Sequence, residues 1–226
     1  MSPKNLSIAL LGLVIVTILY LTLRCDCFLE KELQRSKPSK STEYKKKLSE
    51  SEWKHFDYAV KECRVILKSD ALLLKKADYW ENYGIDPAVG YAAWLFQETR
   101  FKGDVVGDNG KAYGYGQIHS AALEEMNEIR AARGWRKFSL EELNGRSRER
   151  VKFFLFALHD YINLCSERYG RKRNLDADLN AWNGGCSGGS EKENKYSGEI
   201  KSIILQYHER KKAGKETKQK RASAKH

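Results

Sequence analysis

The chain has 226 residues, a length that fits one medium-sized domain with extensions. Its formal net charge of +11 indicates an anionic partner, such as nucleic acid, an anionic membrane surface or an acidic cell-wall polymer. The chain contains only 3 prolines, and its apolar residues recur mostly at helical spacing, so the fold is predicted to be all-α.

The five cysteines argue against a metal site. None forms a pair with zinc-ligand spacing to a second pair or to histidine, so neither a metal nor another cofactor is expected. An odd number also excludes complete internal pairing. Cys165 and Cys186 are compatible with a disulfide in an oxidising compartment, and equally with two buried thiols.

Residues 1–30 are predicted to be a membrane anchor. Residues 6–23 form an apolar run of about the length that spans a bilayer, preceded by Lys4 and followed by Arg24. A cleaved signal peptide is the alternative, but the run is long for one and no small-x-small cleavage pattern follows it. Residues 31–50 are polar and rich in lysine, which is typical of a stalk.

The remaining apolar pattern predicts a helical domain over residues 51–208. Helices are expected at residues 51–67, 71–83, 86–101, 120–132, 147–169, 176–182 and 196–207. Residues 103–116 contain five glycines and are predicted to form a loop or a small hairpin. Residues 209–226 are basic and lack large apolar side chains, so they are predicted to be a disordered tail.

The helix expected at residues 86–101 carries the main candidate for a catalytic residue. Asp86 can cap this helix, and Pro87 suits the first helical position. The body is apolar on nearly all sides, as in a buried helix, yet Glu98 lies inside its aromatic stripe. A carboxyl group that leaves water needs a partner, a proton or a function.

Three short segments follow one another along the chain in a specific order. They are QETRF at residues 97–101, GYGQI at residues 114–118 and AWNGG at residues 181–185. Together they resemble the lytic transglycosylases of the soluble, goose-lysozyme-like family, and the resemblance covers roughly residues 71–207. It implies a lysozyme-like helical domain in which the glycine-rich loop or hairpin lines a substrate groove.

The resemblance implies cleavage of the β-1,4 bond between N-acetylmuramic acid and N-acetylglucosamine in peptidoglycan. Glu98 would protonate the leaving oxygen and then accept the proton of the muramic acid 6-hydroxyl, which leaves a 1,6-anhydro end. Burial among Tyr91, Trp94 and Phe101 would keep the carboxyl protonated. The acetamido group of the substrate would replace a second protein carboxylate.

The resemblance also implies a set of groove residues that bind the sugar by close backbone approach, amide hydrogen bonds or ring stacking. These are Gly114, Tyr115, Gln117, Ile118, Trp182, Asn183 and Tyr113. Trp182 stands where the family has a tyrosine whose hydroxyl contacts the catalytic glutamate. Asp108 falls near a family serine that helps to position the acetamido group.

Two alternative functions remain open. Asp104 or Asp108 could activate water, which would make the protein a hydrolase of the muramidase type. The charge of +11 also suits a non-catalytic cell-wall-binding or basic structural protein. The expected partners are peptidoglycan glycan strands, the membrane through the N-terminal helix, and components of a cell-envelope machine or a phage, but not nucleic acid.

Two arguments about location disagree. The lysines and arginines that follow the apolar run would place the domain in the cytoplasm by the positive-inside rule. Peptidoglycan lies outside the cytoplasm, which requires the domain on the periplasmic or extracytoplasmic side. We adopt the second argument, because the flanking charges are few and belong to a stretch of mixed charge.

Overall fold

The computed structural model describes residues 47–170, 173–186, 192 and 194–223. The predicted anchor at residues 1–30 and most of the predicted stalk lie outside these residues. No helix among the described residues is long and apolar enough to cross a membrane. The described chain is mostly helical with one short hairpin, which confirms the prediction of an all-α domain.

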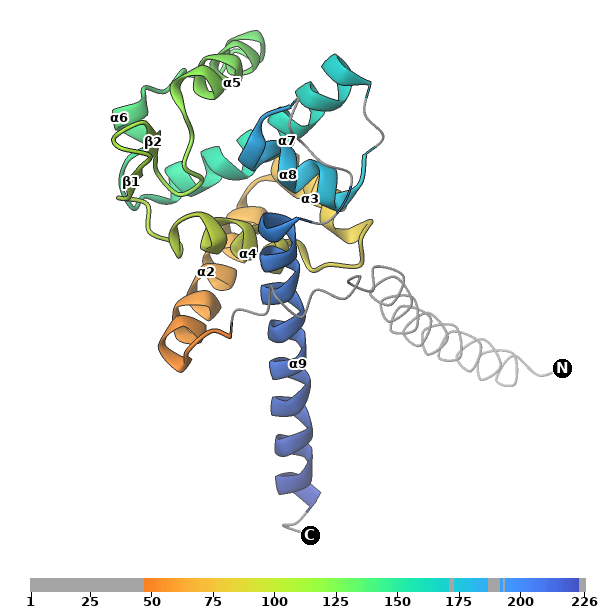
Figure 1. Cartoon of the computed structure of the whole chain (residues 1–226). Coiled ribbons are helices and arrows are strands. Elements are labelled where there is room, and N and C mark those ends of the chain that lie inside the picture. Colours follow the sequence, from red (N-terminus) through yellow and green to blue (C-terminus); the bar gives the residue numbers. More distant parts are fainter. Residues whose placement is uncertain (1–46, 171–172, 187–191, 193, 224–226) are drawn as a thin grey trace, which may run out of the picture.

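The order of elements follows the predicted order (Figure 1). The helices are α2 (Glu50–Ser69), α3 (Ala71–Glu81), α4 (Pro87–Thr99), α5 (Ser120–Ala132), α6 (Leu140–Leu143), α7 (Arg148–Tyr169), α8 (Leu175–Gly184) and α9 (Lys195–Ser223). Between α4 and α5 the antiparallel strands β1 (Val106–Gly107) and β2 (Ala112–Tyr113) form the hairpin expected in the glycine-rich segment.

Helix α4 is the centre of the domain and packs against α2, α3 and α9 (Figure 1). Asp86 caps its start by accepting a hydrogen bond of 2.9 Å from the backbone N–H of Ala88, and Pro87 occupies the first turn. The helix ends where Arg100 takes a left-handed conformation. Nearly every residue of its body is buried, as the sequence predicted.

Aromatic side chains fill the core around α4. Trp80 packs so closely over Gly90 that a Cβ there would lie 2.3 Å from the indole ring, so this position requires glycine. The Tyr91 hydroxyl forms a hydrogen bond with Nε2 of His159 in α7. A disulfide between Cys165 and Cys186 joins α7 to the residues after α8, which resolves the alternatives that the sequence left open.

The predicted disordered tail is wrong, because α9 continues as a helix to Ser223. Two ion pairs hold the part of α9 that follows the core residues. Arg210 forms hydrogen bonds of 2.7 and 2.8 Å with Glu50, and Lys211 lies 2.7 Å from Asp57. Lysine, glutamate, glutamine and alanine, which have high helix propensity, make up most of the helix beyond these ion pairs.

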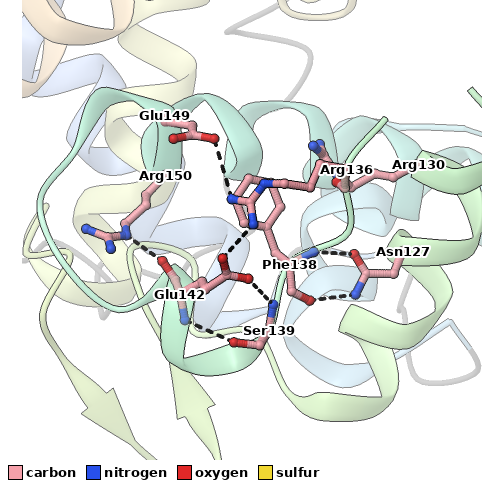
Figure 2. Close-up of polar contacts among 8 residues, drawn as sticks. All are labelled: Asn127, Arg130, Arg136, Phe138, Ser139, Glu142, Glu149 and Arg150. Atoms are coloured by element: carbon pink, nitrogen blue, oxygen red, sulfur yellow. Dashed lines mark hydrogen bonds and ion pairs between the residues drawn. The ribbon is translucent and has the colours of Figure 1, made fainter. Parts of the chain in front are cut away.

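The connection between α5 and α7 is a stiff polar turn that contains the unpredicted helix α6 (Figure 2). Asn127 pairs with both backbone groups of Phe138, at 2.7 and 3.0 Å. Ser139 and Glu142 form a capping box at the start of α6. Since α6 packs against β2, this turn supports the hairpin.

Candidate active site

Glu98 lies in the last turn of α4, and its side chain is half-buried. Burial raises the pKa of its carboxyl group to about 7. The Tyr196 hydroxyl donates a hydrogen bond to Oε1 and lowers the pKa, whereas the negative charge of Asp108 raises it. In the described part of the chain no lysine or arginine forms an ion pair with Glu98, so this acid can hold a proton near neutral pH.

Tyr196 reaches Glu98 from the first turn of α9. One residue earlier on α4, Gln97 donates a hydrogen bond to Glu199, so two neighbouring contacts fasten the start of α9 to the end of α4. Burial and the charge of Glu98 raise the pKa of Tyr196 well above its usual value, which keeps its hydroxyl a proton donor. The sequence predicted this helix but not the contact, because no local pattern marks Tyr196.

Two tryptophans form the apolar side of the site. Trp94 lies one turn before Glu98 and is fully buried, and its ring meets the ring of Trp182 edge to face at 4.9 Å. Among the described residues, the Trp94 indole N–H has no hydrogen-bond partner of normal geometry. It lies close enough to the Tyr196 hydroxyl to lower the pKa of that group slightly against the larger effect of burial. Trp94 lies four residues before Glu98 on the same face of α4, so its buried ring adds apolar surface next to this residue.

Trp182 connects α8 to the hairpin instead of contacting Glu98. Its indole N–H donates a hydrogen bond of 3.0 Å to the carbonyl oxygen of Gly116, and its half-buried ring also packs on Tyr161 at 5.6 Å. In this chain the hydroxyl that donates a hydrogen bond to Glu98 belongs to Tyr196. The role of Trp182 in sugar binding stays a prediction.

Two of the expected groove residues are core residues. The Tyr115 ring is only 4% exposed and packs against Phe101 at 5.0 Å, so it cannot stack on a sugar as the sequence suggested. Ile118 is also buried. The carbonyl of Tyr115 accepts a hydrogen bond of 3.1 Å from the Thr99 hydroxyl, which ties the hairpin to the end of α4.

Gly114 and Gly116, which follow β2, face helices α6 and α7 and not an open groove, contrary to the expected sugar contact. A Cβ at Gly114 would lie 2.6 Å from the carbonyl oxygen of Leu143, and one at Gly116 would lie 2.6 Å from Cδ1 of Phe154. Gln117 donates its amide hydrogens to the carbonyls of Val105 and Gly114, at 3.1 and 3.0 Å. Both amide hydrogen bonds of Gln117 therefore stabilise the turn.

Tyr113 is half-buried and Asn183 is exposed, so both remain accessible to a substrate. Asp108 lies on the hairpin turn with φ of +47°, and its carboxylate is 2.9 Å from Nε2 of His119. Asp104 instead pairs with Arg146 at 2.9 Å, which lowers its pKa. Of the two candidate second carboxylates, the structure therefore couples Asp108 to Glu98.

Within the described ranges, no cluster of three or more His, Cys, Asp or Glu side chains is placed to hold a metal ion. No protein-family model, no curated protein and no solved structure matches this chain. The site consists of a protonatable acid, Glu98, that accepts a hydrogen bond from the hydroxyl of Tyr196, with the buried Trp94 one helical turn away.

Proposed function

We propose that the protein is a peptidoglycan lytic transglycosylase with a lysozyme-like catalytic domain and Glu98 as its acid and base. The observation that carries the proposal is the environment of this carboxyl group. Burial raises its pKa to about 7, and its hydrogen-bond partner is a neutral hydroxyl instead of a cation. An acid with a pKa near the working pH can both give and accept a proton.

In the proposed reaction, protonated Glu98 gives its proton to the glycosidic oxygen as the bond from this oxygen to C1 of N-acetylmuramic acid breaks. The substrate acetamido group stabilises the positive charge that develops on this sugar. The Glu98 carboxylate then takes the proton of the 6-hydroxyl, whose oxygen bonds to C1. No water is consumed, and Glu98 ends protonated as it began.

Tyr196 has a defined part in this cycle. Its hydroxyl donates to Oε1, so it stabilises the carboxylate that exists between the two proton transfers. Since its own pKa is raised well above the usual value, it does not lose its proton at the working pH. Tyr113 and Asn183 are the accessible residues proposed to contact the glycan strand.

A hydrolase is the second candidate, and one observation favours it. The charge of Asp108 raises the pKa of Glu98, and the Asp108 carboxylate is exposed, so water can reach it. The pairing of Asp104 with Arg146 makes Asp104 the weaker choice. Both mechanisms use Glu98 as the acid, and they differ in whether the new sugar end is anhydro or reducing.

We also propose that residues 1–30 anchor the domain on the extracytoplasmic side of a membrane. The disulfide between Cys165 and Cys186 supports this side, because such bonds persist in oxidising compartments. A reporter fused to the C-terminus tests the orientation. A signal from the cytoplasm contradicts it.

Digestion of purified sacculi, followed by mass spectrometry of the products, tests the function. We expect anhydro ends from the native protein and a loss of about 10³-fold in rate for Glu98→Gln. Glu124→Gln, an exposed glutamate of α5, serves as the matched control and retains the native rate. Full activity in Glu98→Gln contradicts the assignment of the acid, and reducing ends identify the hydrolase.

A further inference from the structure

A cavity of about 280 Å³ opens between α2 and α9, and the proposed reaction does not use it. Four basic side chains line it together with one carboxylate, that of Asp57. The basic side chains are Lys61, Arg64, Lys68 and Lys211. Tyr207 and two valines form its apolar wall. The lining therefore combines an excess of positive charge with apolar surface.

The positive charge of the cavity is only partly neutralised by the protein. Lys211 lies 2.7 Å from Asp57, and Arg64 lies 2.6 Å from Asp86, which caps α4. Lys61 and Lys68 form no ion pair with any residue that the structure describes, and both are exposed. Two ammonium groups at the edge of a cavity thus retain capacity for an anionic ligand.

The arrangement of these groups favours a tetrahedral oxyanion. Lys61, Arg64 and Lys68 recur at intervals of three and four residues, so they share one face of α2. Lys211 approaches from α9, on the other side of the cavity. Lys61 and Lys68, which pair with no acid among the described residues, present several ammonium N–H donors. These match the several oxygens of a phosphate group better than the flat, singly charged carboxylate of a peptide.

The size and the apolar wall limit the rest of the ligand. A cavity of about 280 Å³ lies just below the range for small-molecule sites, which is about 300–1,000 Å³, so only a small ligand fits. Val65 is 39% exposed, and with the Tyr207 ring it offers apolar surface to a few carbon atoms. These dimensions suit one phosphate group on a short polyol.

We propose that the cavity between α2 and α9 binds a phosphate group carried on a short polyol, of which glycerol phosphate is the simplest example. In an envelope such a group occurs in soluble or wall-bound phosphodiester polymers and in lipid headgroups. The cavity borders the start of α4, whereas Glu98 lies at its end, and 13 helical residues correspond to about 20 Å. The proposal therefore does not rest on the activity of Glu98.

Calorimetric titration of the full-length chain in a neutral detergent tests this site, with glycerol 3-phosphate as the probe at constant ionic strength. We expect saturable binding that weakens about fivefold or more in Lys61→Ala/Lys68→Ala. The matched control is Lys54→Ala/Lys75→Ala, which removes two exposed charges outside the cavity and leaves the affinity unchanged. An equal loss in both variants, or the absence of saturable binding, overturns the proposal.

Two further arms identify the source of the phosphate. A lipid headgroup is supported if the protein binds phosphatidylglycerol vesicles but not phosphatidylcholine vesicles, and if Lys61→Ala/Lys68→Ala abolishes this binding. Binding of a soluble glycerol phosphate polymer with the same dependence, and without vesicle binding, supports a wall polymer. A DNA duplex that displaces glycerol 3-phosphate and binds more tightly through the same lysines overturns the assignment, because the site is then a nucleic-acid contact.

Discussion

Glu62 and Glu98 lie on the packed helices α2 and α4, and each is at least partly removed from water, but their partners differ. Glu62 is 9% exposed and accepts hydrogen bonds of 2.6 and 3.0 Å from the Arg148 guanidinium, which lowers its pKa. Glu98 accepts a hydrogen bond from the hydroxyl of Tyr196, and burial raises its pKa to about 7. Burial alone therefore does not distinguish a structural carboxylate from a catalytic acid.

The comparison indicates that the charge of the hydrogen-bond partner determines whether a buried carboxyl group is protonated near neutral pH. A guanidinium stabilises the carboxylate of Glu62 and makes it a permanent anion that links α2 to α7. A neutral hydroxyl leaves Glu98 free to exist in both protonation states near neutral pH. The two glutamates should therefore respond to substitution and to pH in opposite directions.

The largest expected effect is a gain in stability for Glu98→Gln at alkaline pH. Because the folded pKa of about 7 exceeds the usual glutamate pKa of 4.5, the unfolded chain ionises first, and native stability falls as pH rises from 4.5 to 7. The cost reaches at most about 3 kcal/mol above pH 7, and the neutral glutamine avoids it. Urea unfolding of both proteins between pH 4 and pH 8 measures the difference. A constant difference across this range contradicts the raised pKa.

Glu62→Gln should have the opposite effect, with a loss of about 1–2 kcal/mol at pH 7. The folded pKa of Glu62 is lowered, so its stabilisation is present above pH 4.5 and is lost as pH falls through the lowered value. Glu62→Gln should therefore converge with the native protein only when the urea series is extended below pH 4, whereas Glu98→Gln converges with it already near pH 4. If Glu62→Gln is as stable as the native protein at pH 7, the ion pair with Arg148 contributes nothing to stability.

Tyr196→Phe tests the comparison by removing the hydroxyl that donates a hydrogen bond to Glu98. Its hydrogen bond lowers the pKa of Glu98, so its loss should move the alkaline limb of kcat/KM to higher pH. The rate should also fall about tenfold, because the carboxylate formed during the reaction loses its donor. Tyr58→Phe, an exposed tyrosine of α2, is the control. If the rate falls but the alkaline limb of the kcat/KM pH profile does not move, the role of Tyr196 is purely structural.

The sequence predicted α4 closely because its signals are local. Asp86 and Pro87 mark its start, and the continuous apolar body marks its burial. The contact between Tyr196 and Glu98 joins residues that are distant along the chain, and no spacing rule reports such a contact. The same reason explains the helical tail, whose first ion pairs are with Glu50 and Asp57 of α2.

The glycine-rich hairpin shows a different limit of sequence interpretation. A glycine next to a predicted site is compatible with close approach of a ligand or of the protein itself. Here a Cβ at Gly116 would meet the Phe154 ring, and the buried ring of Tyr115 packs within the domain. The position of the hairpin was predictable, but the side on which its glycines face was not.

The smallest expected effect concerns Asp108, which is exposed and acts on Glu98 only through its charge. Its side chain is 69% exposed, so water screens the interaction strongly. Asp108→Asn should lower the pKa of Glu98 and move the alkaline limb of kcat/KM down by about 0.3 pH unit. Asp104→Asn should leave the limb in place, because Asp104 pairs with Arg146.

The same pair of variants also separates the two mechanisms that share Glu98. A base that activates water contributes about 10²–10⁴-fold, so a hydrolase would lose at least a hundredfold in rate in Asp108→Asn, together with its reducing-end products. A lyase keeps its rate and its anhydro ends, and only the pH profile moves. Product mass spectrometry beside the pH profile therefore shows whether the charge of Asp108 merely adjusts the acid or whether its carboxylate takes part in the reaction.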